Sequence, residues 1–191
     1  MKRSLLAHVA VGWRSSLAIL ASLTLLIGSI AEVNRIPSAS MRPTLLEGDR
    51  IWVNKLAYAL HVPFTTIALL DWSAPQRGDV VVFFSPADGK RCVKRVVGVP
   101  GDHVDIAGQS VLVPEQHYFV MGDNRDQSID SRCYGCVEQE QMIGRVSGIV
   151  ISFDRAHFYW PRWQRVLQSC QANLTQARIS LTTLPCTSVR R

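Results

Sequence analysis

The hydrophobic pattern of the chain has two parts, a long apolar stretch near the start and short alternating runs after it. No charged side chain occurs from residue 15 to residue 31, and counting through Val33 gives 19 positions. As a helix these would span about 28 Å. A bilayer core is about 30 Å thick and requires internally hydrogen-bonded backbone, so the pattern predicts a transmembrane helix over 15–33. A cleavable signal peptide is the alternative, although the stretch is long for one.

Beyond residue 34, apolar and polar residues alternate over short runs that are separated by turn residues. Alternation with period two indicates β-strands with one buried face. The cluster at 86–89 is typical of a hairpin turn between two of these strands. The pattern therefore predicts a mainly β domain. Its strands are expected near 50–55, 80–84, 91–97, 103–106, 110–113 and 143–153.

Two segments do not follow either pattern. Residues 56–76 are apolar with prolines inside them, which favours a covered connection over an apolar flap that meets a membrane. The tail contains an aromatic and basic run at 158–163, which suits either a membrane interface or a buried aromatic lid. Pro161 is a candidate for the first position of a helix that runs to about Ala177.

These patterns divide the chain into four parts, with boundaries at residues 14, 33 and 155. Lys2, Arg3 and Arg14 precede the apolar stretch, so the positive-inside rule places the N-terminus in the cytoplasm and the β-rich domain outside. The parts are a cytoplasmic N-terminus (1–14), the transmembrane helix (15–33), the β-rich domain (34–155) and a partly helical tail that is a candidate for membrane contact (156–191).

The net charge of +6 is concentrated at the two ends of the chain. Residues 155–191 carry six arginines and no acidic residue, whereas the central part is slightly acidic. A nucleic-acid-binding protein is expected to carry a basic face on its folded domain, so this class is excluded. Basic ends next to an apolar segment fit anionic lipid better.

The five cysteines do not form a recognisable metal or disulfide pattern. Cys133 and Cys136 have the spacing of a redox or zinc pair, but no second pair completes the four ligands of a structural zinc site. We therefore predict neither a metal nor a cofactor. An odd number leaves at least one free thiol in a monomer, and the pairing stays open. The cysteines are Cys92, Cys133, Cys136, Cys170 and Cys186.

Two residues have chemistry that fits together. Ser40 lies between Pro37 and Pro43, which favour a stiff, non-helical loop, although a simple hinge has the same composition. Lys94 lies on a predicted strand whose alternation puts it on one face with Cys92 and Val96. A buried lysine has a lowered pKa and can be neutral near pH 7, which makes it a possible base for a serine nucleophile. None of the five histidines lies in a Ser-His-Asp motif.

Four sequence blocks together resemble the type I signal peptidases, membrane-anchored serine endopeptidases. The blocks are residues 37–45, 77–83, 93–102 and 122–132, and they stand in the order of that family. The resemblance implies antiparallel sheets in a partly open, barrel-like catalytic domain after one transmembrane helix. It also implies that the polar loop at 122–132 holds a hydrogen-bonded network, whereas in isolation a solvated loop is the equally ordinary interpretation.

The resemblance implies a role for each matching residue. Ser40 is the nucleophile and Lys94 the general base, and the Ser38 hydroxyl forms the oxyanion hole with the backbone N–H of Ser40. Ser128 orients the lysine. The implied ionic scaffold is Arg95, Asp123, Asp130 and Arg132, and the implied walls of the substrate pocket are Ile36, Pro37, Met41, Leu45, Cys92 and Val93.

The resemblance also implies partners and a location. We expect preproteins with signal peptides as substrates, a lipid bilayer as surroundings, no nucleic acid, and a monomer in the bacterial inner membrane with its catalytic domain outside the cytoplasm. Three alternatives stay open at this point. They are a dedicated conjugation or pilin-processing peptidase, a self-cleaving repressor, which would need a DNA-binding domain in place of the apolar N-terminus, and a catalytically dead membrane-tethered binding protein.

Overall fold

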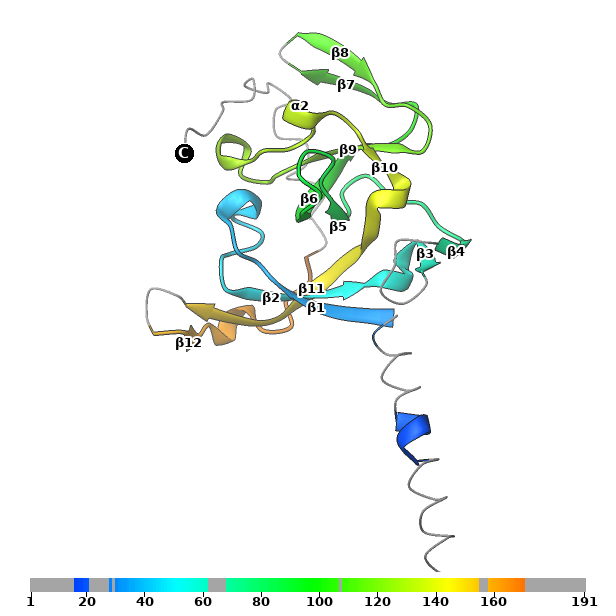
Figure 1. The fold of residues 1–191 in the computed structure, drawn as a ribbon. Helices are drawn as coiled ribbons and strands as arrows, with labels where there is room; N and C mark the ends of the chain where they lie inside the picture. Colours follow the sequence, from blue (N-terminus) through cyan, green and yellow to red (C-terminus); the bar gives the residue numbers. More distant parts are fainter. Residues whose placement is uncertain are drawn as a thin grey trace, which may run out of the picture.

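The structure, a computed structural model, describes residues 16–20, 28, 30–61, 68–106, 108–154 and 158–170. The main element is one curled antiparallel sheet of eight strands, from which the N-terminal helical residues lead away (Figure 1). The strand order is β1-β2-β11-β5-β6-β9-β10, with β12 paired to β11 beside this path. The prediction of a mainly β, antiparallel domain is confirmed. The strands are β1 (Ala31–Arg35), β2 (Asp49–Asn54), β5 (Val80–Phe84), β6 (Arg91–Gly98), β9 (His117–Met121), β10 (Val137–Glu138), β11 (Met142–Asp154) and β12 (Trp160–Pro161).

The long strand β11 connects the two halves of the sheet. It pairs with β2 along one edge and with β5 along the other. Its register against β2 shifts between Val146 and Gly148 and again between Ile149 and Ile151. Bulges of this kind bend a strand and increase its twist, which lets the sheet curl.

Two small hairpins extend from the main sheet. β7 (His103–Ile106) pairs with β8 (Gln109–Leu112), as the pattern predicts. β3 (Ala59–His61) pairs with β4 (Ala68–Asp71) inside the segment interpreted as a covered connection. Leu70 and Trp72 are 64% and 54% exposed. Within the described ranges, this segment is thus buried at its base, at Tyr58 and Ala59, whereas Leu70 and Trp72 are exposed.

The first strand changes the boundary of the predicted transmembrane helix. Residues 16–20 are helical, but Ala31–Arg35 are extended and pair antiparallel with β2, with Val33 opposite Trp52. The last three positions of the predicted helix therefore belong to the sheet. Their backbone N–H and C=O groups form hydrogen bonds with β2 in place of hydrogen bonds within a helix. No helix in the described ranges is long and apolar enough to cross a bilayer. Residues 1–15 and 21–27 lie outside those ranges.

The helix predicted from Pro161 is wrong over the described residues. Pro161 belongs to β12, opposite Phe153 of β11. The next turn, η5 (Trp163–Arg165), is a single 3-10 turn, and Leu167 has a φ of 58° that a helix does not allow. Tertiary contacts override the local preference, since the Arg162 N–H donates to the Ser152 carbonyl. The remainder of the predicted helix, beyond residue 170, lies outside the described residues.

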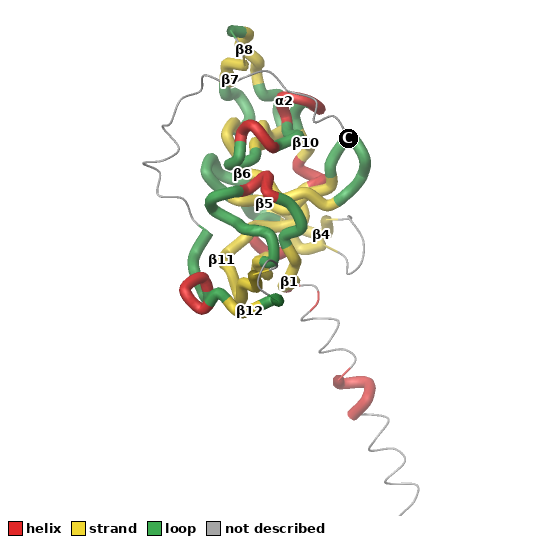
Figure 2. Tube along the Cα trace, turned by 90° about the vertical axis from the view of Figure 1, so that its left-hand side faces the viewer, coloured by secondary structure: helices red, strands yellow, loops and turns green. Residues whose placement is uncertain are grey.

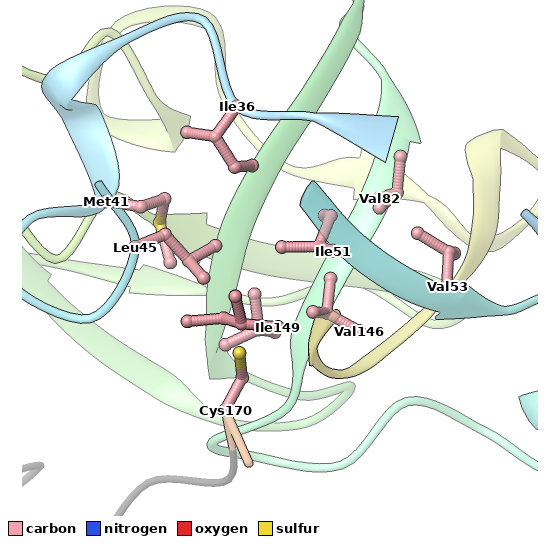
Figure 3. Packing of buried hydrophobic residues seen from close by; sticks show 10 residues of the cluster. Ile36, Met41, Leu45, Ile51, Val53, Val82, Val146, Ile149 and Cys170 are labelled. Carbon is pink, nitrogen blue, oxygen red and sulfur yellow. The ribbon is translucent and has the colours of Figure 1, made fainter. Parts of the chain in front are cut away.

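The core lies on both faces of the curled sheet. One cluster lies beneath the turn that follows β1, and Figure 3 shows how its side chains converge from β2, β5 and β11. A second cluster, around Phe83 and Tyr118, fills the other face of β5, β6 and β9. The first cluster is formed by Ile36, Met41, Leu45, Ile51, Val53, Val80, Val82, Val146, Ile149 and Cys170.

Candidate active site

Ser40 lies in a one-turn 3-10 helix, η1 (Ala39–Met41), directly after the exposed Pro37 and Ser38. Ser38 is extended, and its Oγ lies 3.3 Å from the Oγ of Ser40. Met41 is buried in the core, and its carbonyl accepts a hydrogen bond from the Leu45 N–H. Apolar side chains on both sides of the turn thus hold the half-buried Ser40 at the edge of the core.

Lys94 lies in the middle of β6 and is 4% exposed. Burial lowers its pKa, because the charged ammonium loses its hydration, and the positive charge of Arg132 lowers the pKa further. The charges of Asp130 and Asp123 act in the opposite direction but do not reverse the shift. With the described residues Lys94 forms no ion pair. The burial that the strand pattern predicts for this lysine is therefore present.

The turn of Ser40 and the strand of Lys94 meet at Gly122. Gly122 follows β9 one position beyond the pairing of Arg95 with Met121, so it lies beside Lys94 on the neighbouring strand. A Cβ added at Gly122 would lie 2.5 Å from the backbone oxygen of Ser40 and 2.2 Å from Ser128 Oγ. The structure thus brings the Ser40 backbone, the strand position of Lys94 and the Ser128 side chain together around a position that has room only for glycine.

Replacing Gly122 with alanine is expected to reduce kcat by at least about 100-fold, because a displacement of the reacting groups by about 1 Å has effects of that size. The added methyl group would displace the Ser40 backbone. Backbone cannot move aside as easily as the end of a flexible side chain can. Steady-state cleavage kinetics measure the loss. Gly28→Ala is the control, because a Cβ there meets nothing within 4 Å and the residue is helical, a conformation that alanine adopts without strain. A Gly122→Ala protein with wild-type kcat would show that the site tolerates the shift.

Asn124 connects the polar loop to the Ser40 turn. Its backbone N–H donates to the Ser40 carbonyl at 3.0 Å, and its Nδ2 donates to the Ala39 carbonyl at 3.2 Å. The loop also contains η3 (Arg125–Gln127), which packs against η1. Residues 122–124 therefore support the serine turn, whereas 125–127 are exposed.

The first half of the predicted ionic scaffold joins the lysine strand to this loop. Arg95 donates two parallel hydrogen bonds to Asp123, from Nε at 2.8 Å and from Nη2 at 2.7 Å. Its Nη1 donates to the Gly78 carbonyl. The Thr44 hydroxyl donates to the same Asp123 carboxylate at 2.6 Å. A bidentate guanidinium–carboxylate pair fixes orientation as well as distance. Arg95 and Asp123 therefore hold β6 against the polar loop at 122–132.

The second half of the predicted ionic scaffold is the pair of Asp130 and Arg132. Their side chains are 0% and 3% exposed. Arg132 donates to Asp130 from Nε at 2.8 Å and from Nη2 at 3.0 Å, and Nη2 also reaches the Arg125 carbonyl. The Gly122 N–H donates to Asp130 Oδ2, the oxygen that also accepts from Arg132 Nη2. Burial alone would raise the pKa of Asp130, but the bonds from Arg132 and Gly122 together hold it below its ordinary value.

Ser128 is buried beside Gly122, and its Oγ forms no hydrogen bond within the described part of the chain. The bond to Lys94 that the resemblance implies is therefore not formed in this structure. Buried hydroxyls normally have a partner. An unpaired hydroxyl next to a buried lysine keeps Ser128 a candidate for orienting the amine.

The predicted pocket walls have different surroundings. Ile36, Met41 and Leu45 are at most 2% exposed and belong to the core in Figure 3, so any pocket that they border is closed in this structure. Val93 is half-buried against the same cluster. Cys92 is half-buried on the opposite face of β6, and Pro37 is exposed.

Several contributing residues were missed by reasoning from the sequence. Thr44, Gly122 and Asn124 lie inside the quoted blocks, so their position in a motif was a usable signal. Ser131 has the same kind of signal, and its Oγ accepts a hydrogen bond from the Val120 N–H in the core. Asp49 lies outside every block, and neither its burial nor its partner can be read from the pattern.

The cysteines do not pair as their spacing suggests. Cys133 is disulfide-bonded, whereas Cys92, Cys136 and Cys170 are free thiols. Cys133 and Cys136 are therefore not bonded to each other. In the part of the chain that the structure describes, no cluster of histidine, cysteine or acidic side chains has the geometry of a metal site.

Comparisons with known proteins show the family of this chain. The family model described as "Signal peptidase, peptidase S26" matches residues 10–113 and 108–151. A signal peptidase I of Pseudomonas fluorescens is 31% identical over 72% of this chain and 71% of its own length. One from Buchnera aphidicola subsp. Schizaphis graminum is 27% identical over 72% and 73%. A crystal structure of a signal peptidase I from Enterococcus faecalis, 32% identical, overlaps 38% of this chain and 97% of its own with a TM-score of 0.35. This chain belongs to the signal peptidase family, peptidase S26.

Proposed function

We propose that the chain is a serine endopeptidase that removes N-terminal signal peptides from exported proteins by a Ser-Lys mechanism. The observation that supports it most strongly is the meeting of Ser40, the buried Lys94 and Ser128 at Gly122. A serine hydroxyl is a weak nucleophile and needs a base, and a lysine with a lowered pKa is such a base.

In the proposed first step, Lys94 Nζ takes the proton of Ser40 as Oγ attacks the scissile carbonyl. The negative charge that develops on the carbonyl oxygen is stabilised by the Ser38 hydroxyl and the Ser40 N–H, each worth about 3–4 kcal/mol in comparable sites. The protonated Lys94 then donates its proton to the leaving amine, and an ester with Ser40 remains. In the second half, Lys94 takes a proton from the water that attacks the ester and returns it to Ser40 Oγ as the ester bond breaks, which restores both residues.

The activity is expected to rise with pH through the lowered pKa of Lys94. Burial is the main cause of this lowered pKa. The amine of Lys94 therefore becomes neutral at a pH below its ordinary pKa of 10.5. A protonated amine cannot accept the serine proton, so log(kcat/KM) should rise with slope one on the acidic side and level off below pH 10.5. Cleavage rates across a pH series measure this. A midpoint at or above 10.5 would contradict a buried base, provided that circular dichroism shows a folded protein at each pH.

The proposed substrate is an extended peptide that adds main chain to main chain beside the Ser40 turn. The core side chains beneath this turn leave little space, so small residues before the cut, as in Ala-x-Ala, fit best. Half-buried Val93 and exposed Pro37 are the candidates for contact with the substrate surface.

We also propose the membrane setting. Residues 15–30 would anchor a single-pass monomer in the bacterial inner membrane, with the N-terminus in the cytoplasm and the sheet outside. Trp160 and Trp163 are 71% and 69% exposed, which supports contact of this edge with a lipid interface. An anchor raises the effective concentration of a substrate that is itself held in the bilayer.

The direct test uses the full chain, purified in detergent, with several unrelated precursors that carry signal peptides. Mass spectrometry should find one cut after a small residue in each precursor, and replacing that residue with phenylalanine should prevent the cut. Cleavage of a single pilin-like precursor alone would indicate a dedicated peptidase. A folded protein that cuts none of them would contradict the proposed function.

A further inference from the structure

The segment from β12 to Cys170 lies beyond residue 151, where the match to the family ends, yet it is built into the domain. The Ile149 N–H donates to the Gln168 carbonyl at 2.8 Å, and Ser169 forms a bridge with Gly148. Cys170 is buried in the core beneath Ile149 (Figure 3). Figure 2 shows the short helical turn of this segment beside β11 and β12. The segment is thus held in place at residue 160 and again at residue 170.

Arg165 extends from this segment to the loop that follows Ser40. Its Nη2 donates to the Thr44 carbonyl at 2.8 Å and pairs with Asp49 Oδ2, also at 2.8 Å. Asp49 is fully buried, and its carboxylate also accepts hydrogen bonds from the Leu46 N–H and the Ser152 hydroxyl. One guanidinium therefore closes the loop from residue 44 to residue 49.

Thr44 links this closure to the lysine strand. Its carbonyl is held by Arg165, while its hydroxyl donates to Asp123 at 2.6 Å. Asp123 is the carboxylate that Arg95 binds with two parallel hydrogen bonds, and Arg95 follows Lys94 directly on β6. The path Arg165–Thr44–Asp123–Arg95 thus connects the loop of the nucleophile to the strand of the base through short polar contacts.

We propose that Arg165 is a positioning residue that sets the placement of Ser40 relative to Lys94. The proposal rests on the proposed function. It gives the C-terminal segment a role in positioning the catalytic residues. Arg165 touches no reacting atom, so it acts only by fixing Thr44. Loss of this contact is expected to lower the rate of the chemical step while substrate binding is kept.

A purely structural role for Arg165 has a different signature. Removing the arginine leaves the buried Asp49 carboxylate without its counter-charge, which destabilises the fold whether or not the site is displaced. The Asp49→Asn/Arg165→Met double variant removes both charges and so relieves this effect. It still lacks the contact to the Thr44 carbonyl. Asp49→Asn alone removes the charge pair but keeps that contact.

The experiment compares the wild type, Arg165→Met, Asp49→Asn and the double variant as full chains in detergent. Cleavage kinetics and thermal unfolding are measured together, with Arg145→Met as the control for loss of a half-exposed arginine outside this path. We expect Arg165→Met and the double variant to lose at least tenfold in kcat with KM within about twofold, since small displacements of reacting groups have large effects. Asp49→Asn should keep kcat within about threefold of the wild type.

The outcomes separate the two proposals. A wild type that cleaves no precursor would contradict the proposed function itself. With an active wild type, unchanged kcat in Arg165→Met would overturn the positioning role alone. Recovery of kcat together with thermal stability in the double variant would show that the arginine only neutralises Asp49. If Arg165→Met is too unstable to assay, the comparison of Asp49→Asn with the double variant decides the question.

Discussion

Lys94→Ala is expected to reduce kcat by about a million-fold, the scale seen when one member of a catalytic pair is removed. Without the amine, nothing in the proposed mechanism takes the Ser40 proton during attack or returns one to the leaving group. Ser40→Ala should lose as much, and the double variant should lose no more, because residues that act as a unit are not additive. The measurement is single-turnover cleavage of a precursor at neutral pH.

The control for Lys94→Ala is Lys90→Ala. Lys90 pairs with Asp88 in the turn before β6, and its side chain is 80% exposed. Its removal should leave kcat unchanged. Near-UV circular dichroism of each variant shows whether the core is intact. A folded Lys94→Ala protein that still cut well at neutral pH would mean that another group is the base.

Asp130→Asn is expected to destabilise the fold by about 3–5 kcal/mol, the usual effect of breaking a buried pair from one side. The Arg132 guanidinium, 3% exposed, would stay buried after losing the charge of Asp130. Activity should fall as well, because the Gly122 N–H donates to the same carboxylate. Thermal unfolding in detergent measures the stability. Asp88→Asn, in an exposed pair with Lys90, is the control and should leave the unfolding temperature unchanged.

The effect of Asp130 also has a pH signature. Its pKa is lowered in the folded protein below the ordinary value of 3.8, because its hydrogen bonds outweigh the effect of burial. The unfolded chain therefore takes up the proton more readily, and the stabilisation by Asp130 is present above pH 3.8 and is lost as the pH falls below it. The wild type should lose stability in that range more steeply than Asp130→Asn. Parallel curves would show that the carboxylate contributes nothing through its charge.

The sequence predicted the strands well where alternation and turn residues agreed. The hairpin of β5 and β6 follows from the apolar run at 80–84 and the alternating strand at 91–97 on either side of the turn at 86–89, and the structure confirms it. Prediction failed where a local preference met a tertiary contact. Pro161 is compatible with the first turn of a helix, but in the folded domain it lies in β12, which pairs with the edge of β11. In the same way, residues 31–33 continue the apolar stretch in the predicted membrane helix and are instead paired with β2.

The amino-acid sequence by itself determined the mainly β class, the blocks that carry the family resemblance and the choice of Ser40 and Lys94, because period, turn chemistry and motif order are local properties. Only the tertiary structure decided that the Ser40 backbone and Ser128 meet at Gly122 beside the strand of Lys94, and that Arg165 reaches back across the domain to Thr44. These contacts join positions far apart in the chain, so no spacing along the sequence encodes them.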